Sequence, residues 1–221
     1  MKANELFCKM WDAPYIHGEK YSGSYAVWIE ENTLYISFQQ TVRKQDWKQS
    51  FKLQSIKLEY GDLKGVEVHL GFFQQYFEVI SSLLDKVLNE LKENPQVDSV
   101  VICGWSQGAV LASLCYKIFA NTVKKSDKEN YISHKCVLFG MPNFIKKRSL
   151  EKWRNLPCGN VIEFQHACDL FSYLPLGYTK PKTQKIILGK RFNIFKAIFE
   201  IRKYHTSYID FENAQNTNRE I

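Results

Sequence analysis

The chain has 221 residues, of which 45% are hydrophobic and 14% aromatic, and it carries a moderate net charge of +7. This length and composition exclude an intrinsically disordered protein and favour a single domain over residues 1–221, with a loose polar tail at 213–221. No run of about 18 apolar residues is present, so a transmembrane helix is not expected.

The basic residues gather in three short runs: Lys124–Lys125, Lys146–Arg148 and residues 180–191. Two interpretations fit these runs. They are either a solvated surface that keeps the protein soluble or a patch that contacts an anionic membrane surface. Because helix-turn-helix, zinc-finger and RNP patterns are missing, nucleic acid is not an expected partner.

Six cysteines are scattered without the paired spacing of a zinc site or a disulfide framework. Cys103, Cys115 and Cys136 fall inside apolar elements, where a free thiol behaves as a small hydrophobic group. The first residues lack the basic and apolar regions of a signal peptide. We therefore expect reduced thiols in a cytoplasmic or otherwise intracellular protein, either free in solution or peripheral at membranes. Export without a signal peptide stays open.

The first half of the chain predicts a short helix or loop, a hairpin and a long helix. Residues 1–22 are mixed in character, whereas Ser24–Glu30 and Thr33–Gln39 alternate apolar and polar residues, as paired strands do. Residues 48–68 carry only weak strand patterns. Residues 71–94 form the clearest helix, with these apolar residues expected on one buried face: Phe73, Tyr76, Phe77, Ile80, Leu84, Val87, Leu88 and Leu91.

The second half predicts buried strands that alternate with helices. The strands are expected at Val100–Cys103, His134–Phe139, Asn160–His166 and Lys185–Leu188, and a helix at Phe192–Tyr204. This alternation indicates an α/β fold with a mostly parallel sheet. Because ligands bind beyond the carboxyl ends of such strands, the residues expected on one rim are Ser106, Gly140, Asp169 and the turn Gln39–Thr41.

The segment Gly104-Trp105-Ser106-Gln107-Gly108 has the G-x-S-x-G pattern of a nucleophile elbow. The pattern alone is common, but here a buried strand precedes it and a helix rich in small residues follows it. In such an elbow the serine sits on a tight strand-to-helix turn, and glycines two positions away on each side avoid a steric clash. The start of the helix directs backbone N–H groups at an oxyanion formed over the serine.

A serine needs a histidine base and an acid that orients it. In this architecture the chain order is Ser, then Asp or Glu, then His. His205 is the one histidine beyond both Ser106 and the candidate acid Asp169, which follows a predicted strand. His166 lies too close to Asp169 to act easily as the base. Structural roles are expected for His166, His69 and His17.

Several blocks of the sequence resemble the class 3 lipases, the α/β-hydrolase family that includes fungal triacylglycerol lipases and plant phospholipase-like enzymes. The resemblance extends from about Ser37 to Tyr208 and rests on segments in the family's order: Ser37-Phe-Gln-Gln-Thr41 with Asp46-Trp47, Val68-His-Leu-Gly-Phe72 with Tyr76, Val100–Ala112, Val137-Leu-Phe-Gly-Met-Pro142, Gln165-His-Ala-Cys-Asp169 through Leu174-Pro175, and Tyr204-His-Thr-Ser-Tyr208.

The resemblance implies an α/β-hydrolase fold and a carboxylic-ester hydrolase, a lipase or esterase that acts on lipid or small ester substrates. It implies Ser106 as nucleophile, Asp169 as orienting acid and His205 as base. It also implies an oxyanion hole formed by the backbone N–H groups of Gln107 and Thr41, and it requires no metal or cofactor. Acylglycerols and phospholipids are both compatible substrates.

The sequence departs from the family at Gln39–Gln40, where Arg-Gly is usual, and at Trp105 and Gln107, where His and Leu are favoured. Trp105 is expected to crowd the nucleophile and to shape an acyl or head-group site. The short polar stretch after Thr41 argues against a large apolar lid. The loss of the glycine at Gln40 favours one alternative, a weakly active or inactive lipase-like binding or scaffold protein. A phospholipase, thioesterase or acyltransferase that uses the same serine is a further alternative.

Overall fold

The computed structural model describes residues 1–40, 52–59, 61–125, 133–155, 160–188, 201–206 and 208. Several predicted features lie outside these residues: Thr41, Asp46-Trp47, the helix start at Phe192 and the tail 213–221. The helices are α1 (Ala3–Asp12), α3 (Leu70–Glu93), α4 (Gln107–Lys125), α5 (Leu150–Asn155) and α7 (Ile201–Thr206), with short 3₁₀ turns η1 (Gly61–Leu63), η2 (Lys147–Ser149) and η3 (Leu170–Tyr173). The strands are β1 (Ile16–His17), β2 (Ser24–Glu30), β3 (Thr33–Phe38), β4 (Ser55–Lys57), β5 (Glu67–His69), β6 (Ser99–Trp105), β7 (Ser133–Phe139), β8 (Asn160–His166) and β9 (Gln184–Leu188).

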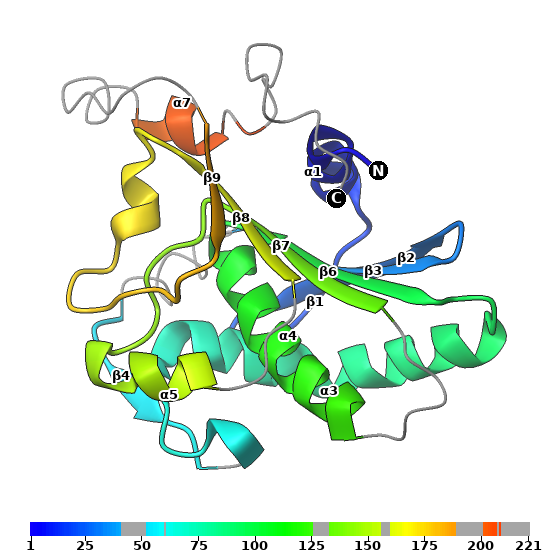
Figure 1. The fold of residues 1–221 in the computed structure, drawn as a ribbon, viewed down its shortest axis with the longest axis horizontal. Helices are drawn as coiled ribbons and strands as arrows, with labels where there is room; N and C mark the ends of the chain where they lie inside the picture. Colours follow the sequence, from blue (N-terminus) through cyan, green and yellow to red (C-terminus); the bar gives the residue numbers. More distant parts are fainter. Residues whose placement is uncertain are drawn as a thin grey trace.

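A seven-stranded sheet with the order β1-β2-β3-β6-β7-β8-β9 forms the centre of the molecule (Figure 1). β2 and β3 pair antiparallel, as the hairpin pattern predicts, and β3 through β9 pair parallel within this sheet. Strands β4 and β5 form a separate antiparallel pair. The mostly parallel α/β sheet expected from the sequence is therefore confirmed.

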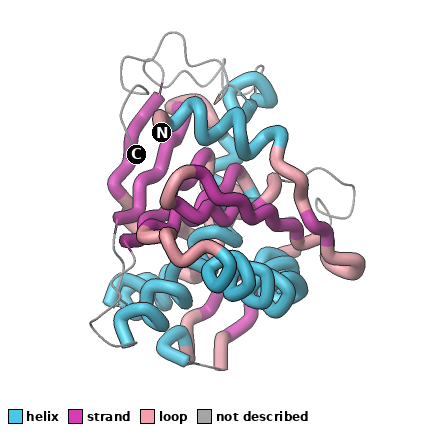
Figure 2. The backbone as a smooth tube through the Cα atoms, turned by 90° about the vertical axis from the view of Figure 1, so that its right-hand side faces the viewer, coloured by secondary structure: helices cyan, strands magenta, loops and turns pink. Residues whose placement is uncertain are grey.

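The sheet lies between two layers of helices, which the side view separates clearly (Figure 2). On one face α3 and α4 pack over the sheet and enclose a large apolar core. On the other face α1 covers a smaller cluster, formed by Leu6 and Phe7 of the helix with Tyr35, Val101 and Val137 of the strands. The two cores fix the parallel strands from both sides, as continuous apolar strands require.

The parallel strands end at a common edge of the sheet. In the register of the sheet, Phe38 of β3 lies opposite Gly104 of β6, and Trp105 lies opposite Phe139 of β7. Gln39, Ser106 and Gly140 directly follow these strand ends, and Asp169 follows the end of β8. The predicted rim is confirmed for its described members.

The expected buried face of α3 is confirmed for Phe73, Tyr76 and Val87, and Ile80 and Leu91 pack partly buried against the core, but the rest of the face differs. Tyr76, Val79, Leu83 and Val87 are buried, whereas three residues of the expected face are exposed: Phe77 at 61%, Leu84 at 50% and Leu88 at 63%. Each exposed residue directly follows a buried one, so it is rotated by about 100° around the helix axis. The apolar sector of α3 is wider than its contact with the sheet, and the sequence pattern alone does not locate the contact.

The cysteines inside apolar elements are buried, as predicted. Burial raises the pKa of the Cys103 and Cys115 thiols to about 12, so both stay protonated at neutral pH and act as packing groups. No helix in the described part of the chain has the length and apolar character needed to cross a membrane.

Candidate active site

Ser106 occupies the turn between β6 and α4. Its φ of 56° is in the left-handed region, which a residue other than glycine rarely adopts, and it indicates a strained turn. The Ser106 N–H donates a hydrogen bond to the Phe139 carbonyl oxygen at 2.8 Å, and the Ser106 carbonyl oxygen accepts one from the Ala109 N–H at 2.9 Å. The next residue, Gln107, begins α4, so its N–H lies in the first turn, where no intrahelical acceptor is available.

Two glycines allow the close packing of this turn. A Cβ atom on Gly104 would lie 2.2 Å from the Gly108 carbonyl oxygen, and one on Gly108 would lie 2.1 Å from the Phe38 carbonyl oxygen. Both contacts are with backbone, which cannot move aside without displacing β3 or α4. The sequence pattern G-x-S-x-G is therefore a packing requirement of this chain.

His205 of α7 connects Ser106 to Asp169. The imidazole Nε2 lies 2.7 Å from the Ser106 Oγ, and Nδ1 lies 2.9 Å from both carboxylate oxygens of Asp169. Asp169 is completely buried, and the His205 side chain is 12% exposed. The structure thus brings together the three predicted residues from three separate segments of the chain, with the geometry that proton transfer from a serine needs.

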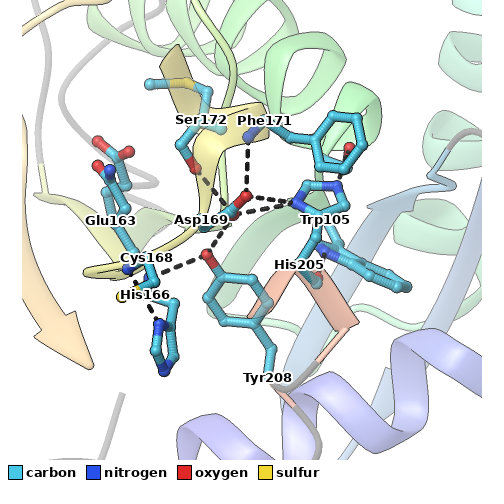
Figure 3. Close-up of polar contacts among 12 residues, drawn as sticks. Trp105, Glu163, His166, Cys168, Asp169, Phe171, Ser172, His205 and Tyr208 are labelled. Atoms are coloured by element: carbon cyan, nitrogen blue, oxygen red, sulfur yellow. Dashed lines mark hydrogen bonds and ion pairs between the residues drawn. The ribbon is translucent and has the colours of Figure 1, made fainter. Parts of the chain in front are cut away.

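The Asp169 carboxylate is held by three further donors (Figure 3). Its Oδ1 accepts a hydrogen bond from the Phe171 N–H at 3.1 Å, and its Oδ2 accepts bonds from the Ser172 hydroxyl at 2.9 Å and the Tyr208 hydroxyl at 2.8 Å. These bonds satisfy the carboxylate in a site without water contact, where an unpaired charge would be costly. They also fix the orientation of the carboxylate towards His205.

Tyr208 connects the end of β8 to the carboxylate. Its hydroxyl accepts a hydrogen bond from the His166 N–H at 3.0 Å while donating to Asp169. Burial raises the pKa of Tyr208 well above its usual value, and the negative charge of Asp169 acts in the same direction, so the hydroxyl keeps its proton. Gly140, with a φ of 54°, packs against this pair: a Cβ there would lie 2.8 Å from the Asp169 Oδ2.

The imidazole of His205 lies between two aromatic rings. The ring centroid of Phe171 is 4.7 Å away and that of Trp105 is 5.8 Å away. Trp105 was expected to crowd the nucleophile, but its ring is buried against α1, where it stacks on Trp11 at 5.1 Å and meets the edge of Phe7 at 5.1 Å. The reason is strand alternation, which directs the Trp105 side chain to the α1 face of the sheet.

The remaining histidines of the sequence analysis lie outside the Ser106–His205–Asp169 group. The His166 Nδ1 accepts a hydrogen bond from the Cys168 N–H at 3.2 Å, and its ring packs on Tyr204. The His69 Nδ1 caps α3 by accepting from the Phe72 N–H at 3.3 Å. His17 pairs with the Ser24 hydroxyl at 2.7 Å. All three have the structural contacts expected of them.

Two of the basic runs are partly neutralised. Arg148 forms an ion pair with Glu67, and Lys180 is largely buried, where its ammonium group contacts Glu163 at 2.6 Å and the Met141 carbonyl oxygen at 2.8 Å. The Lys180 side chain is therefore mostly buried in an ion pair and contributes little to a basic surface. Contact of the other basic residues with an anionic membrane stays a prediction.

Sequence reasoning missed two partners of Asp169. Ser172 reaches the carboxylate because η3 turns back over three residues, and a serine at that spacing gives no signal in the sequence. Tyr208 belongs to a segment that the sequence analysis singled out, but its bond to Asp169 depends on packing across the sheet. Among the described residues, no group of acidic, histidine and cysteine side chains is arranged to hold a metal ion.

Comparison with known proteins places the chain in a family. The family described as Lipase (class 3) matches residues 35–177. The lipase of Rhizomucor miehei is 33% identical over 85 residues, which cover 38% of this chain and 23% of that protein. The aligned segment therefore spans less than a quarter of this relative.

Solved structures of fungal lipases share the fold. The triacylglyceride lipase of Rhizomucor miehei superimposes with a TM-score of 0.64 at 18% identity, covering 83% of this chain and 73% of the lipase. A triacylglycerol lipase of Penicillium expansum superimposes with a TM-score of 0.63 at 14% identity, covering 79% of this chain and 68% of that one. These likenesses confirm the α/β-hydrolase fold. With the match over residues 35–177, they show that the chain belongs to the class 3 lipase family.

Proposed function

We propose that the protein is a serine carboxylic-ester hydrolase that cleaves acyl esters of lipids or of small alcohols through Ser106, His205 and Asp169. The observation that carries the proposal is the continuous hydrogen-bonded connection from the Ser106 Oγ through His205 to the buried Asp169 carboxylate. Membership of the class 3 lipase family supports the same reaction class.

In the acylation step the Ser106 Oγ attacks the ester carbonyl carbon while the His205 Nε2 takes the hydroxyl proton. The imidazolium that forms is stabilised by the Asp169 carboxylate, 2.9 Å from Nδ1. The backbone N–H of Gln107 and the start of α4 support the developing oxyanion, and one such donor contributes about 3–4 kcal/mol of transition-state stabilisation. Thr41, the proposed second donor, lies outside the described residues.

The tetrahedral intermediate collapses when the bond to the leaving alcohol breaks, and the His205 imidazolium gives its proton to the alcohol oxygen. In the second half of the reaction His205 takes a proton from water, whose oxygen attacks the acyl carbon on Ser106. The carboxylic acid leaves and the proton returns to the Ser106 Oγ, so that atoms and charges balance without a cofactor.

The test is hydrolysis of nitrophenyl esters of increasing acyl length by the wild type and by Ser106→Ala. We expect turnover by the wild type and a loss of at least a thousandfold in kcat in Ser106→Ala, with an unchanged melting temperature. A folded wild type without turnover on any ester would contradict the proposal and favour a lipase-like binding protein. Transfer of the acyl group to an added thiol or alcohol in preference to water would identify an acyltransferase.

A further inference from the structure

A cavity of about 230 Å³ lies between α1 and the ends of β3 and β6. Trp11 and Tyr15 line it from the α1 side, Gln39 and Gln40 from the end of β3, and Trp105 from the end of β6. Trp105 directly precedes Ser106, and Gln40 directly precedes Thr41, the proposed second oxyanion donor. The cavity therefore lies next to the rim that carries the candidate active site, on the side of α1.

The walls of the cavity are held in place by their own contacts. Trp11 stacks on Trp105, Phe7 packs against the edge of Trp105, and the Trp105 ring in turn contacts His205. The Tyr15 hydroxyl donates to the Met10 carbonyl oxygen and pairs with the Ser37 hydroxyl, both at 2.8 Å. A cavity with walls fixed in this way exists before a ligand arrives, which lowers the entropic cost of binding.

The lining residues that the structure describes favour an uncharged group. None of the described lining residues is acidic or basic, and burial raises the pKa of Tyr15, so its hydroxyl stays neutral. The two glutamine amides supply the polar part of the lining, and aromatic rings and the Met10 side chain supply the apolar part. A carboxylate or ammonium group would lose its hydration there and find no ionic partner among these described residues.

The size of the cavity limits the ligand. A volume of 230 Å³ corresponds to about eight water-sized units of roughly 30 Å³ each. It is below the range of about 300–1,000 Å³ that is common for sites of drug-sized molecules. A chain of about eight carbons or a single aromatic ring fills it, whereas a long fatty-acyl chain does not fit inside.

We propose that this cavity, which we call the α1 pocket, binds one of the two groups that flank the ester carbonyl, and that this group is compact, uncharged and largely apolar. The proposal rests on the proposed ester hydrolysis, because it places the pocket beside the reacting serine. The bound group is either a short acyl chain or a small apolar alcohol, since both present the same chemistry to the pocket.

The test changes Trp11, which is 48% exposed, so that its loss does not empty the core. Two substrate series are measured: nitrophenyl esters from acetate to palmitate, and butyrate esters of alcohols from ethanol to naphthol. The matched control is Phe77→Ala, which removes a 61% exposed aromatic ring from α3 on the opposite face of the sheet. Melting temperatures are recorded for each variant.

We expect Trp11→Ala to lower kcat/KM roughly tenfold for the best compact substrate in one series and to shift the preference in that series towards larger groups. We expect Phe77→Ala to keep the wild-type dependence of kcat/KM on group size in both substrate series. If the acyl series changes, the acyl chain occupies the α1 pocket; if the alcohol series changes, the alcohol does. Profiles of Trp11→Ala that coincide with the wild type in both series would overturn the proposal.

A binding measurement separates this proposal from the proposed function. Ser106→Ala is titrated with the ethyl esters of the acyl series and the butyrates of the alcohol series, and binding is followed by the change in fluorescence of the five tryptophans, which include Trp11 and Trp105. We expect saturable binding of compact esters, weakened at least tenfold when Trp11→Ala is added. An inactive wild type contradicts the proposed hydrolysis, whereas a titration that Trp11→Ala leaves unchanged contradicts the α1 pocket.

Discussion

The indole Nε1 of Trp105 donates a hydrogen bond of 3.0 Å to the backbone carbonyl oxygen of His205. The donor is the residue before the candidate nucleophile, and the acceptor belongs to the candidate base. The bond therefore connects the elbow directly to α7, in addition to the side-chain contact between His205 and Ser106. It gives a structural role to a tryptophan at a position where the family favours histidine.

Replacing Trp105 with phenylalanine removes this hydrogen bond but keeps an aromatic ring in the cluster. A bond of this kind contributes about 1 kcal/mol, so we expect kcat on a short nitrophenyl ester to fall roughly fivefold, with a smaller change in KM. Trp28→Phe is the control, because Trp28 stacks on Tyr35 and its Nε1 has no partner among the described residues. Equal kcat values for the two variants would show that the Trp105 bond does not position His205.

Gly140→Ala is expected to disturb the Asp169 carboxylate, because the new Cβ would lie 2.8 Å from Oδ2. Gly177→Ala is the matched control: it also has a positive φ, at 81°, but no atom lies within 4 Å of its Cβ position. Both variants should lose about 1–2 kcal/mol of unfolding free energy from backbone strain. Only Gly140→Ala should also lose kcat, by at least tenfold. Similar kcat values in the two variants would argue against tight packing behind Asp169.

Tyr208→Phe removes the acceptor of the partly buried His166 N–H and one donor to Asp169. We expect a loss of about 1–3 kcal/mol in unfolding free energy and a lower kcat. Tyr178→Phe is the control, since it removes a hydroxyl that donates to the Leu53 carbonyl oxygen instead. Urea denaturation and ester hydrolysis should show that Tyr178→Phe reduces stability while kcat stays at the wild-type value. A Tyr208→Phe variant with full activity would limit that hydroxyl to a structural role.

The burial of His69 predicts a pH dependence of stability. Burial lowers its pKa to about 4, and the positive charges of Lys146 and Lys52 act in the same direction. Above pH 6.5 the His69 side chain is neutral in both the folded and the unfolded chain. Between pH 6.5 and 4 the unfolded chain binds a proton that the folded chain does not, so the unfolding free energy falls by about 3 kcal/mol as the pH decreases.

His69→Asn tests this pH dependence. Asparagine keeps a side-chain acceptor at the N-cap of α3 and does not titrate. Urea denaturation from pH 7 to pH 4 should give a shallower loss of stability in the variant than in the wild type. Burial also lowers the pKa of His166, so a smaller dependence of the same sign remains in the variant. If the unfolding free energies of the variant and the wild type fall equally between pH 7 and pH 4, His69 is not a source of the pH dependence.

The sequence was sufficient to predict the strand-turn-helix around Ser106, because its buried strand, paired glycines and small-residue helix are local features that agree with one another. The chain order of Ser106, Asp169 and His205 also follows from the pattern of the second half. The strand hairpin at residues 24–38 is also predictable, since two runs rich in β-branched and aromatic residues flank the polar pair Glu31-Asn32.

What the sequence could not predict depends on long-range packing. The direction of the Trp105 ring follows from its strand position, but its contact with Trp11 requires α1 to return to the sheet. The α1 pocket requires α1, β3 and β6 to meet, and no local pattern encodes that meeting. The predicted buried face of α3 is wrong at Phe77, Leu84 and Leu88, because the helix has more apolar residues than its contact with the sheet can cover.

The most direct test of the central claim is covalent labelling of the protein with a nitrophenyl phosphonate ester, followed by mass spectrometry of the peptides. If Ser106 is the nucleophile and His205 its base, one phosphonate group attaches to Ser106, Ser106→Ala is not labelled, and His205→Ala is labelled at least a hundredfold more slowly. Labelling of a different residue, or of Ser106 at the same rate with and without His205, would contradict the account.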